Sequence, residues 1–197
     1  MKLRQLLPHT APSRLTLPVA RGLAVLGVTP NMVSAIGFLG NCGAAALVAT
    51  GHFWQAGVAM LFFSLLDVFD GALARLTGTA SPFGAVFDAV LDRASEAALL
   101  LGVVIYYANR GDELEVVLAY AAVAGSIMVS YVRARGEGSG IMIKEGLFTR
   151  AERVVILGAG LILGLVLPVL AILAVLANLT AVQRLLAVRR AAALDDA

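Results

Sequence analysis

Four aspartates lie close together in an otherwise apolar part of the chain. The segment DVFDGALARLTGTASPFGAVFDAVLD, residues 67–92, carries Asp67, Asp70, Asp88 and Asp92. An acid at the centre of a membrane helix costs about 2.5–3.5 kcal/mol on insertion scales, so an acid that is kept there usually faces a polar cavity and has a function. Helical spacing puts Asp67 and Asp70 on one stripe, and Asp88 and Asp92 on a stripe of the next helix. Two such stripes facing each other would bring four carboxylates together.

Converging carboxylates need cations between them, because like charges at short distance repel one another and take up protons. Ligand sets made only of oxygen select hard cations, so the sequence predicts Mg²⁺, with Mn²⁺ as the alternative, and a site with this many acids can hold two ions. Paired ions of this kind clamp phosphate groups during displacement at phosphorus. Gly71 and Gly84 leave room beside the acids for a bulky ligand, although small residues also serve close helix packing in membranes.

The composition predicts a membrane environment for these helices. Of 197 residues, 60% are hydrophobic and 14% charged, whereas soluble domains have roughly 45–50% apolar and about 25% charged residues. A bilayer core needs roughly 20 apolar residues per helix. We therefore expect an all-α integral membrane protein with six transmembrane helices, the last two separated only around Pro168, at roughly 31–50, 54–75, 83–107, 114–134, 153–167 and 169–188.

The segment ahead of the first predicted span has the pattern of a helix lying in the membrane interface. Leu15, Val19 and Leu23 recur at intervals of four residues, with arginines elsewhere on the helix surface. Thr29 then fits a helix N-cap, and Pro30 fits the first turn that follows it. We expect an interfacial helix region at 1–28 and a six-helix membrane domain at 29–197.

The basic residues predict the orientation. With six spans, most of them fall at one side of the membrane, which the positive-inside rule assigns to the cytoplasm. We therefore expect a multi-pass cell-membrane protein with both termini and the aspartates on the cytoplasmic side. The basic residues concerned are Lys2, Arg4, Arg14, Arg21, Arg75, Arg133, Arg135, Lys144, Arg150, Arg153, Arg184, Arg189 and Arg190.

The aspartate segment resembles the signature of a known family. Residues 67–92 read D-x₂-D-G-x₂-A-R-x₈-G-x₃-D-x₃-D, which is similar to the motif of the CDP-alcohol phosphotransferases, integral membrane enzymes of phospholipid synthesis. The resemblance implies that a CDP-linked lipid, CDP-diacylglycerol or a CDP-diether lipid, reacts with an acceptor alcohol to give a phosphodiester and CMP. It also implies a homodimer.

The resemblance further implies a role for each matching position. Asp67, Asp70 and Asp88 would hold the metals, and Asp92 would contact the second metal and act as general base on the acceptor hydroxyl. The CDP portion would lie at the N-terminal end of the first span, where a helix favours anions. Its expected contacts are Asn31, Met32, Val33, Ser34, Gly71, Arg75 and Ser81.

A second cluster of basic residues bears on the acceptor. Arg184 lies inside the apolar run LTAVQRLLAV, where topology alone does not explain it, and several guanidiniums aimed at one place indicate a phosphate monoester. The pieces SYVRAR, RAER and VQR resemble the phosphatidylinositol-phosphate synthases of actinobacteria and their archaeal ether-lipid relatives. That resemblance implies inositol 1-phosphate as the acceptor, held by Arg133, Arg135, Arg153 and Arg184. Glycerol 3-phosphate, the acceptor of a phosphatidylglycerol-phosphate synthase, is the main alternative.

Two further readings belong to other classes. A small membrane transporter would use the acids to bind a translocated cation, but it predicts acids spread through the depth of the bilayer. A prenyl-transferring enzyme would need two separate acidic motifs, whereas these four acids fall in one helical hairpin. No nucleic-acid partner is expected.

Overall fold

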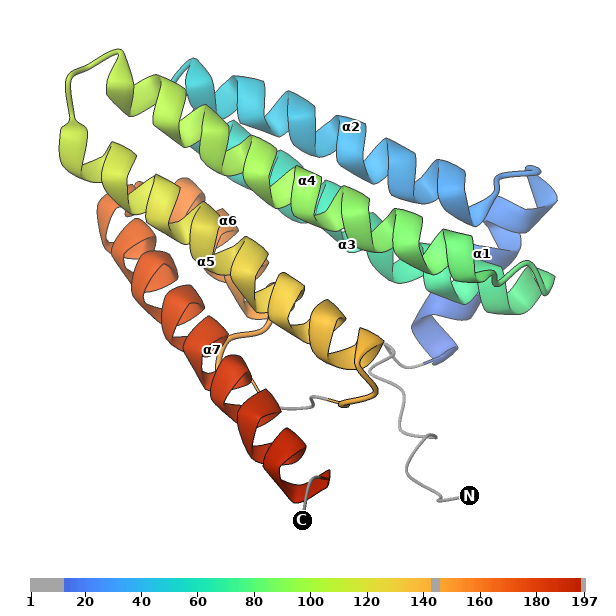
Figure 1. Cartoon of the computed structure of the whole chain (residues 1–197). Helices are drawn as coiled ribbons and strands as arrows, with labels where there is room; N and C mark the ends of the chain where they lie inside the picture. Colours follow the sequence, from blue (N-terminus) through green and yellow to red (C-terminus); the bar gives the residue numbers. More distant parts are fainter. Residues whose placement is uncertain (1–12, 143–145, 196–197) are drawn as a thin grey trace.

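The structure is a computed structural model that describes residues 13–142 and 146–195. These residues form seven α helices and no strand, which confirms the all-α prediction (Figure 1). The helices are α1 (Ser13–Val25), α2 (Pro30–Ala49), α3 (Phe53–Thr77), α4 (Pro82–Ala108), α5 (Glu113–Gly138), α6 (Arg150–Leu163) and α7 (Val166–Asp195). Lys2, Arg4, Lys144 and the first part of the predicted interfacial region lie outside the described residues.

Helices α2 to α7 run alternately up and down in one bundle (Figure 1). Helix α2 packs against both α3 and α4, α6 packs against α3 and α7, and α5 packs against α4 and α7. The short α1 packs on α3 at the end of the bundle where α2 begins (Figure 1). The starts of α2, α4 and α6 therefore share one end of the bundle with the last turns of α3, α5 and α7.

Helix α2 begins as its sequence predicts. The side chain of Thr29 accepts a hydrogen bond from the Met32 N–H at 3.3 Å, and Pro30 opens the helix. Helix α4 begins in the same way, because Ser81 accepts from the Gly84 N–H at 3.0 Å and Pro82 follows it. Each hydroxyl thus satisfies one N–H that a first helical turn leaves without an intrahelical partner.

Four of the described helices are long and apolar enough to cross a membrane, namely α2, α3, α5 and α7. The prediction of six transmembrane helices is therefore not confirmed, for two physical reasons. Helix α4 has the length but carries Asp88, Asp92, Arg93 and Glu96. Helix α6 has only 14 residues, or about 21 Å of helix, which is shorter than a bilayer core of about 30 Å.

The break before α7 also lies earlier than predicted. Helix α6 ends at Leu163 because Gly164 takes the left-handed conformation, with φ of 70°, and closes the last turn. Pro168 lies inside the first turn of α7, where a missing N–H costs no helical hydrogen bond.

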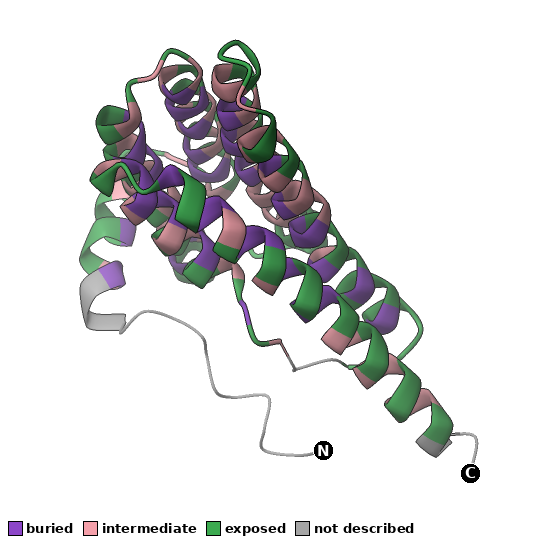
Figure 2. Cartoon of the chain, turned by 90° about the vertical axis from the view of Figure 1, so that its left-hand side faces the viewer, coloured by how far each residue is buried: buried purple, intermediate pink, exposed green. Residues whose placement is uncertain are grey.

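The surface and the helix contacts agree with a membrane-embedded bundle. Buried residues line the inner faces of the helices (Figure 2), while large apolar side chains such as Leu39, Phe62 and Val117 are exposed. Inside, small residues let helices approach closely, as in membrane proteins generally. A Cβ on Gly102, for example, would overlap the carbonyl oxygen of Ala45.

Candidate active site

The four aspartates lie together, as their helical spacing predicts. Asp67 and Asp70 project from α3, and Asp88 and Asp92 from α4. The charge of Asp88 acts on each of the other three, and Asp67 is adjacent to Asp92. All four residues are buried or half-buried. The two helices thus present one compact group of carboxylates.

Helix α2 contacts two of these carboxylates, those of Asp67 and Asp70. The hydroxyl of Ser34, which is buried, donates to Asp70 Oδ2 at 2.6 Å. A Cβ on Gly37 would lie 2.7 Å from Asp67 Oδ1, so only glycine leaves space for that carboxylate. Ser34 was expected on the CDP portion, and in the structure its hydroxyl holds an aspartate. Gly37 was missed, because nothing in the local sequence separates it from other helix-contact glycines.

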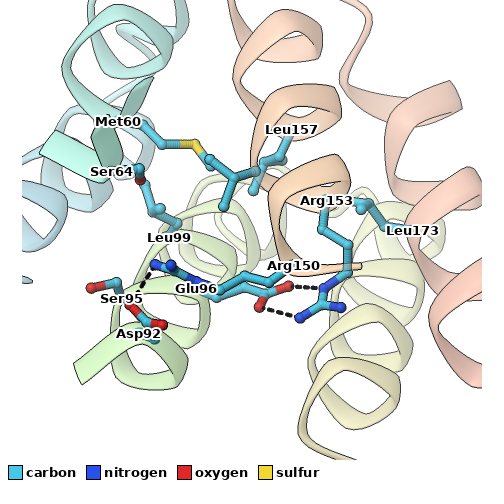
Figure 3. A pocket seen from close by; sticks show the side chains of 11 residues that line it. Met60, Ser64, Asp92, Ser95, Glu96, Leu99, Arg150, Arg153, Leu157 and Leu173 are labelled. Carbon is cyan, nitrogen blue, oxygen red and sulfur yellow. Dashed lines mark hydrogen bonds and ion pairs between the residues drawn. The ribbon is translucent and has the colours of Figure 1, made fainter. Parts of the chain in front are cut away.

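Arg150, the first residue of α6, lies among the aspartates. Its Nη2 is 2.8 Å from Asp67 Oδ2 and 2.7 Å from Asp92 Oδ1; the pair with Asp92 is drawn in Figure 3. From the sequence, Arg150 was placed among the basic residues that set orientation and in the RAER piece of the second basic cluster, but it was given no role at the site. The available signal was its spacing from Arg153, since residues three apart share one helix face.

Arg153 and Glu96 form a buried, doubly hydrogen-bonded ion pair. The Nε of Arg153 donates to Oε1 of Glu96 at 2.7 Å, and its Nη2 donates to Oε2 at 2.9 Å (Figure 3). Ser126 of α5 adds a third hydrogen bond to Glu96 at 2.7 Å. The pair joins the start of α6 to α4 and α5. Arg153, predicted to hold the acceptor phosphate, therefore already has a carboxylate partner, and Glu96 was not predicted at all.

A capping box fixes where α6 begins. The backbone N–H of Thr149 donates to Glu152 at 2.6 Å, and the Thr149 side chain caps the helix in return. The cap sets the register in which Arg150 and Arg153 face the same side.

The remaining predicted arginines lie at the same end of the bundle. Arg184 Nη1 donates to the Val129 carbonyl at 2.9 Å, and the charges of Arg133 and Arg153 act on its guanidinium. Arg133 is exposed and donates to Glu137 at 2.8 Å. Arg135 is exposed in the last turn of α5. Arg133, Arg153 and Arg184 therefore share one neighbourhood.

The residues expected at the CDP portion lie around two adjacent helix starts. A Cβ on Gly84 would lie only 3.4 Å from Asn31 Oδ1. The beginnings of α2 and α4 therefore lie side by side. Their free N–H groups and dipoles make this an anion-friendly position. Met32, Ser81 and Arg75 are exposed there.

Two other expected CDP contacts have different surroundings. The guanidinium of Arg75 comes within 3.4 Å of a Cβ placed on Gly71, so these two residues adjoin. Val33 is buried in a cluster with Ala72 and Leu73. Its side chain is therefore part of the core.

Comparison with known proteins identifies the family. The model of the CDP-alcohol phosphatidyltransferase family matches residues 27–187, which include all four aspartates. The chain belongs to this family. It is a transferase of that type, embedded in a membrane.

Relatives in the CDP-alcohol phosphatidyltransferase family carry informative names. A phosphatidylinositol phosphate synthase of Mycobacterium marinum is 38% identical over 156 residues, which cover 78% of this chain and 67% of the relative. An archaetidylinositol phosphate synthase of Pyrococcus horikoshii is 38% identical over 146 residues, covering 71% and 72% of the two chains.

Solved structures agree with the fold. The crystal structure of the Mycobacterium tuberculosis phosphatidylinositol phosphate synthase with CDP-DAG bound has a TM-score of 0.82 and 34% identity, covering 89% of this chain and 94% of that one. The same protein in complex with manganese and citrate also has a TM-score of 0.82 and 34% identity, with 88% of each chain covered.

The aspartate group fits a hard divalent cation in its chemistry, although its present arrangement is not that of a metal site. Among the described residues, no three His, Cys, Asp or Glu side chains are placed to hold a metal ion, and Arg150 lies between Asp67 and Asp92. Yet the donors are all carboxylate oxygens, and Asp88 Oδ1 is buried with no hydrogen-bond partner in the described part of the chain. A buried acceptor without a donor calls for a cation or another partner.

Proposed function

We propose that this protein transfers the phosphatidyl group of CDP-diacylglycerol, or the equivalent group of a CDP-diether lipid, to inositol 1-phosphate and releases CMP. The observation that carries the proposal is the group of four carboxylates lying at the end of the bundle that also holds the arginines. Such a site combines cation binding with recognition of phosphates, which this displacement requires. The mycobacterial and archaeal relatives named for inositol phosphate chemistry support this acceptor.

Asp67, Asp70, Asp88 and Asp92 would hold two divalent ions, Mg²⁺ or Mn²⁺. When bound, such ions neutralise the diphosphate of the CDP-lipid and make its phosphorus a better electrophile. The residues themselves contribute position, since Ser34 orients Asp70 and Gly37 admits Asp67. The manganese complex of the mycobacterial relative supports a divalent cation in this fold.

The CDP portion would lie across the starts of α2 and α4. Val33 would contribute its backbone, because its side chain is buried, and Ser34 would lie beside the CDP portion while its hydroxyl holds Asp70. The other proposed contacts are Asn31, Met32, Gly71, Arg75 and Ser81. Two neighbouring helix N-termini attract the diphosphate, and Arg75 adds a positive charge.

Asp92 would act as the general base. The acceptor hydroxyl loses its proton to the Asp92 carboxylate while its oxygen forms a bond to the phosphorus that carries the lipid. The bond from that phosphorus to the CMP oxygen breaks, and CMP leaves with the electron pair. Asp92 is suited to this task because it lines one small pocket together with Arg150 and Arg153, and it lies 3.5 Å from Arg93.

Arg133, Arg135, Arg153 and Arg184 would hold the phosphate of the acceptor. Arg184 is the principal candidate, because it lies near Arg133 and Arg153 although it belongs to an apolar stretch of α7. Arg153, paired with Glu96, would contribute its charge and the position of α6. These arginines would recognise the phosphate of the acceptor and not its inositol ring. Glycerol 3-phosphate also carries a phosphate, so the experiment must include it as the competing acceptor.

We further propose the arrangement in the cell. The protein would have an interfacial region at 1–28 and a membrane domain at 29–197 whose six helices α2 to α7 lie in the bilayer. Both termini and the site would face the cytoplasm, and two copies would form a homodimer. The basic residues at the shared end of the bundle support this orientation.

The test is an acceptor panel. Purified protein is given CDP-diacylglycerol and Mg²⁺ with inositol 1-phosphate, glycerol 3-phosphate, free inositol or serine, and the lipid product is identified by mass spectrometry. We expect phosphatidylinositol phosphate as the main product. A better reaction with glycerol 3-phosphate would overturn the acceptor and keep the reaction class, while preference for inositol or serine would overturn the role of the arginines.

A further inference from the structure

Arg150 occupies the position where a cation is most needed among the aspartates. One nitrogen, Nη2, contacts both Asp67 on α3 and Asp92 on α4, at 2.8 and 2.7 Å. Three helices are thus joined through a single guanidinium. A charge placed between two carboxylates removes much of their repulsion, so this arrangement stabilises the group of acids without any bound ion.

The backbone that carries Arg150 is firmly held. Arg153, one turn further along α6, is bound to Glu96 by two hydrogen bonds, and the capping box fixes the helix start at Thr149. Arg153 is 3% exposed. The first turn of α6 therefore stays in place, and only the side chain of Arg150 has freedom to leave the carboxylates.

The contacts of Arg150 also leave polar atoms unsatisfied. Its own Nε and the Oδ1 of Asp88 are both buried, and neither has a hydrogen-bond partner in the described part of the chain. A buried donor and a buried acceptor without partners raise the free energy of an arrangement. This arrangement is therefore one that a better cation can replace.

We propose that Arg150 is the resident counter-cation of the aspartate site and competes with divalent metal ions for the carboxylates of Asp67 and Asp92. The inference rests on the proposed metal-dependent function. It adds that Arg150 holds the aspartates together before an ion binds, and that an ion binds only as the guanidinium gives up these oxygens. Arg150 then also sets how tightly the ion is held.

The test measures Mn²⁺ binding without any substrate. Full-length protein purified in detergent is titrated with Mn²⁺, and the free ion is followed by electron paramagnetic resonance. An arginine beside a carboxylate lowers the pKa of that carboxylate by about 1–3 units, which is a tenfold to thousandfold loss of affinity for a proton. The same repulsion acts on a metal cation, so Arg150→Gln should bind Mn²⁺ at least about tenfold more tightly than the wild type. Arg150→Met, a second neutral replacement, should do the same.

Arg93→Gln is the matched control. It removes the same charge from a residue that contacts one of the aspartates, Asp92 at 3.5 Å, and whose other hydrogen bonds go to Ser130 and to the Ala89 carbonyl, so its effect should be clearly smaller. Unchanged or weaker Mn²⁺ binding in folded Arg150→Gln or Arg150→Met overturns the inference, and so does an equal gain in Arg93→Gln. If Mn²⁺ binding is absent from the wild type and from both Arg150 variants, or persists unchanged in Asp88→Asn, the proposed metal site itself is wrong and the inference falls with it.

Discussion

Asp88 has a charge that acts on each of the other three aspartates, and its Oδ1 is buried without a partner among the described residues. Asp88→Asn removes this charge and keeps the shape of the side chain. Because a ligand would be lost, turnover measured as CMP release should fall at least about a hundredfold, with an unchanged thermal unfolding profile. Asp112→Asn, which changes a partly exposed aspartate at the start of α5, far from the site, should retain full activity; substantial turnover in Asp88→Asn would exclude the metal mechanism.

Asp92 differs from Asp88 in its proposed role, and kinetics separate the two. Loss of a general base typically lowers the rate by about 10²–10⁴-fold, so Asp92→Asn should lower kcat in this range and change the KM for CDP-lipid little. Steady-state kinetics with varied CDP-lipid give both values. A raised KM with a normal kcat would make Asp92 a binding residue instead of the base.

Arg184 tests acceptor recognition. Loss of a bidentate contact with a dianion costs about 1.5–3 kcal/mol, so Arg184→Ala should raise the KM for inositol 1-phosphate roughly ten- to hundredfold. The KM for CDP-lipid should stay the same, because its proposed site lies at the starts of α2 and α4. Arg189, exposed further along α7, is the matched control. An equal rise in the KM for inositol 1-phosphate in Arg184→Ala and Arg189→Ala would mean that both residues act only through the general surface charge.

At the scale of elements, the first turn of α6 depends on one buried ion pair. Glu96→Gln leaves Arg153 with a buried charge and no counter-ion, which typically costs about 3–5 kcal/mol of stability. Thermal unfolding in detergent should show a clear drop in the midpoint. Glu137→Gln breaks the exposed pair with Arg133, and this should change stability by less than about 1 kcal/mol. Similar midpoints for both variants would mean that the buried pair does not anchor α6.

At the scale of the whole molecule, the alternation of helices predicts which loops share a side of the membrane. Ser139 follows α5 at the end that holds the site, and Asn109 follows α4 at the opposite end. In a Cys42→Ala background, Ser139→Cys should react with a membrane-impermeant maleimide only from the cytoplasmic side. Asn109→Cys should react only from the outside. Labelling of both positions from one side would contradict the bundle as oriented here.

Local features of the sequence determined much of this protein. Helices form where apolar residues run for 20 or so positions, Thr29 and Pro30 start α2, and spacings of three and four residues bring the four aspartates together. Each of these depends on residues within a few turns of one another. The same aspartate motif was enough to indicate the family that the comparison then identified.

Only the tertiary structure decided which groups meet the aspartates. Arg150 is separated from Asp67 by 83 positions, and Arg153 from Glu96 by 57. Such contacts depend on how α6 is placed against α3 and α4, and no local pattern encodes that placement. Helix α6 ends where Gly164 takes the left-handed conformation. It is therefore shorter than predicted and is not among the four helices that are long and apolar enough to cross a membrane. The sequence by itself determined the acids; the packing of α6 decided the cation that lies between them.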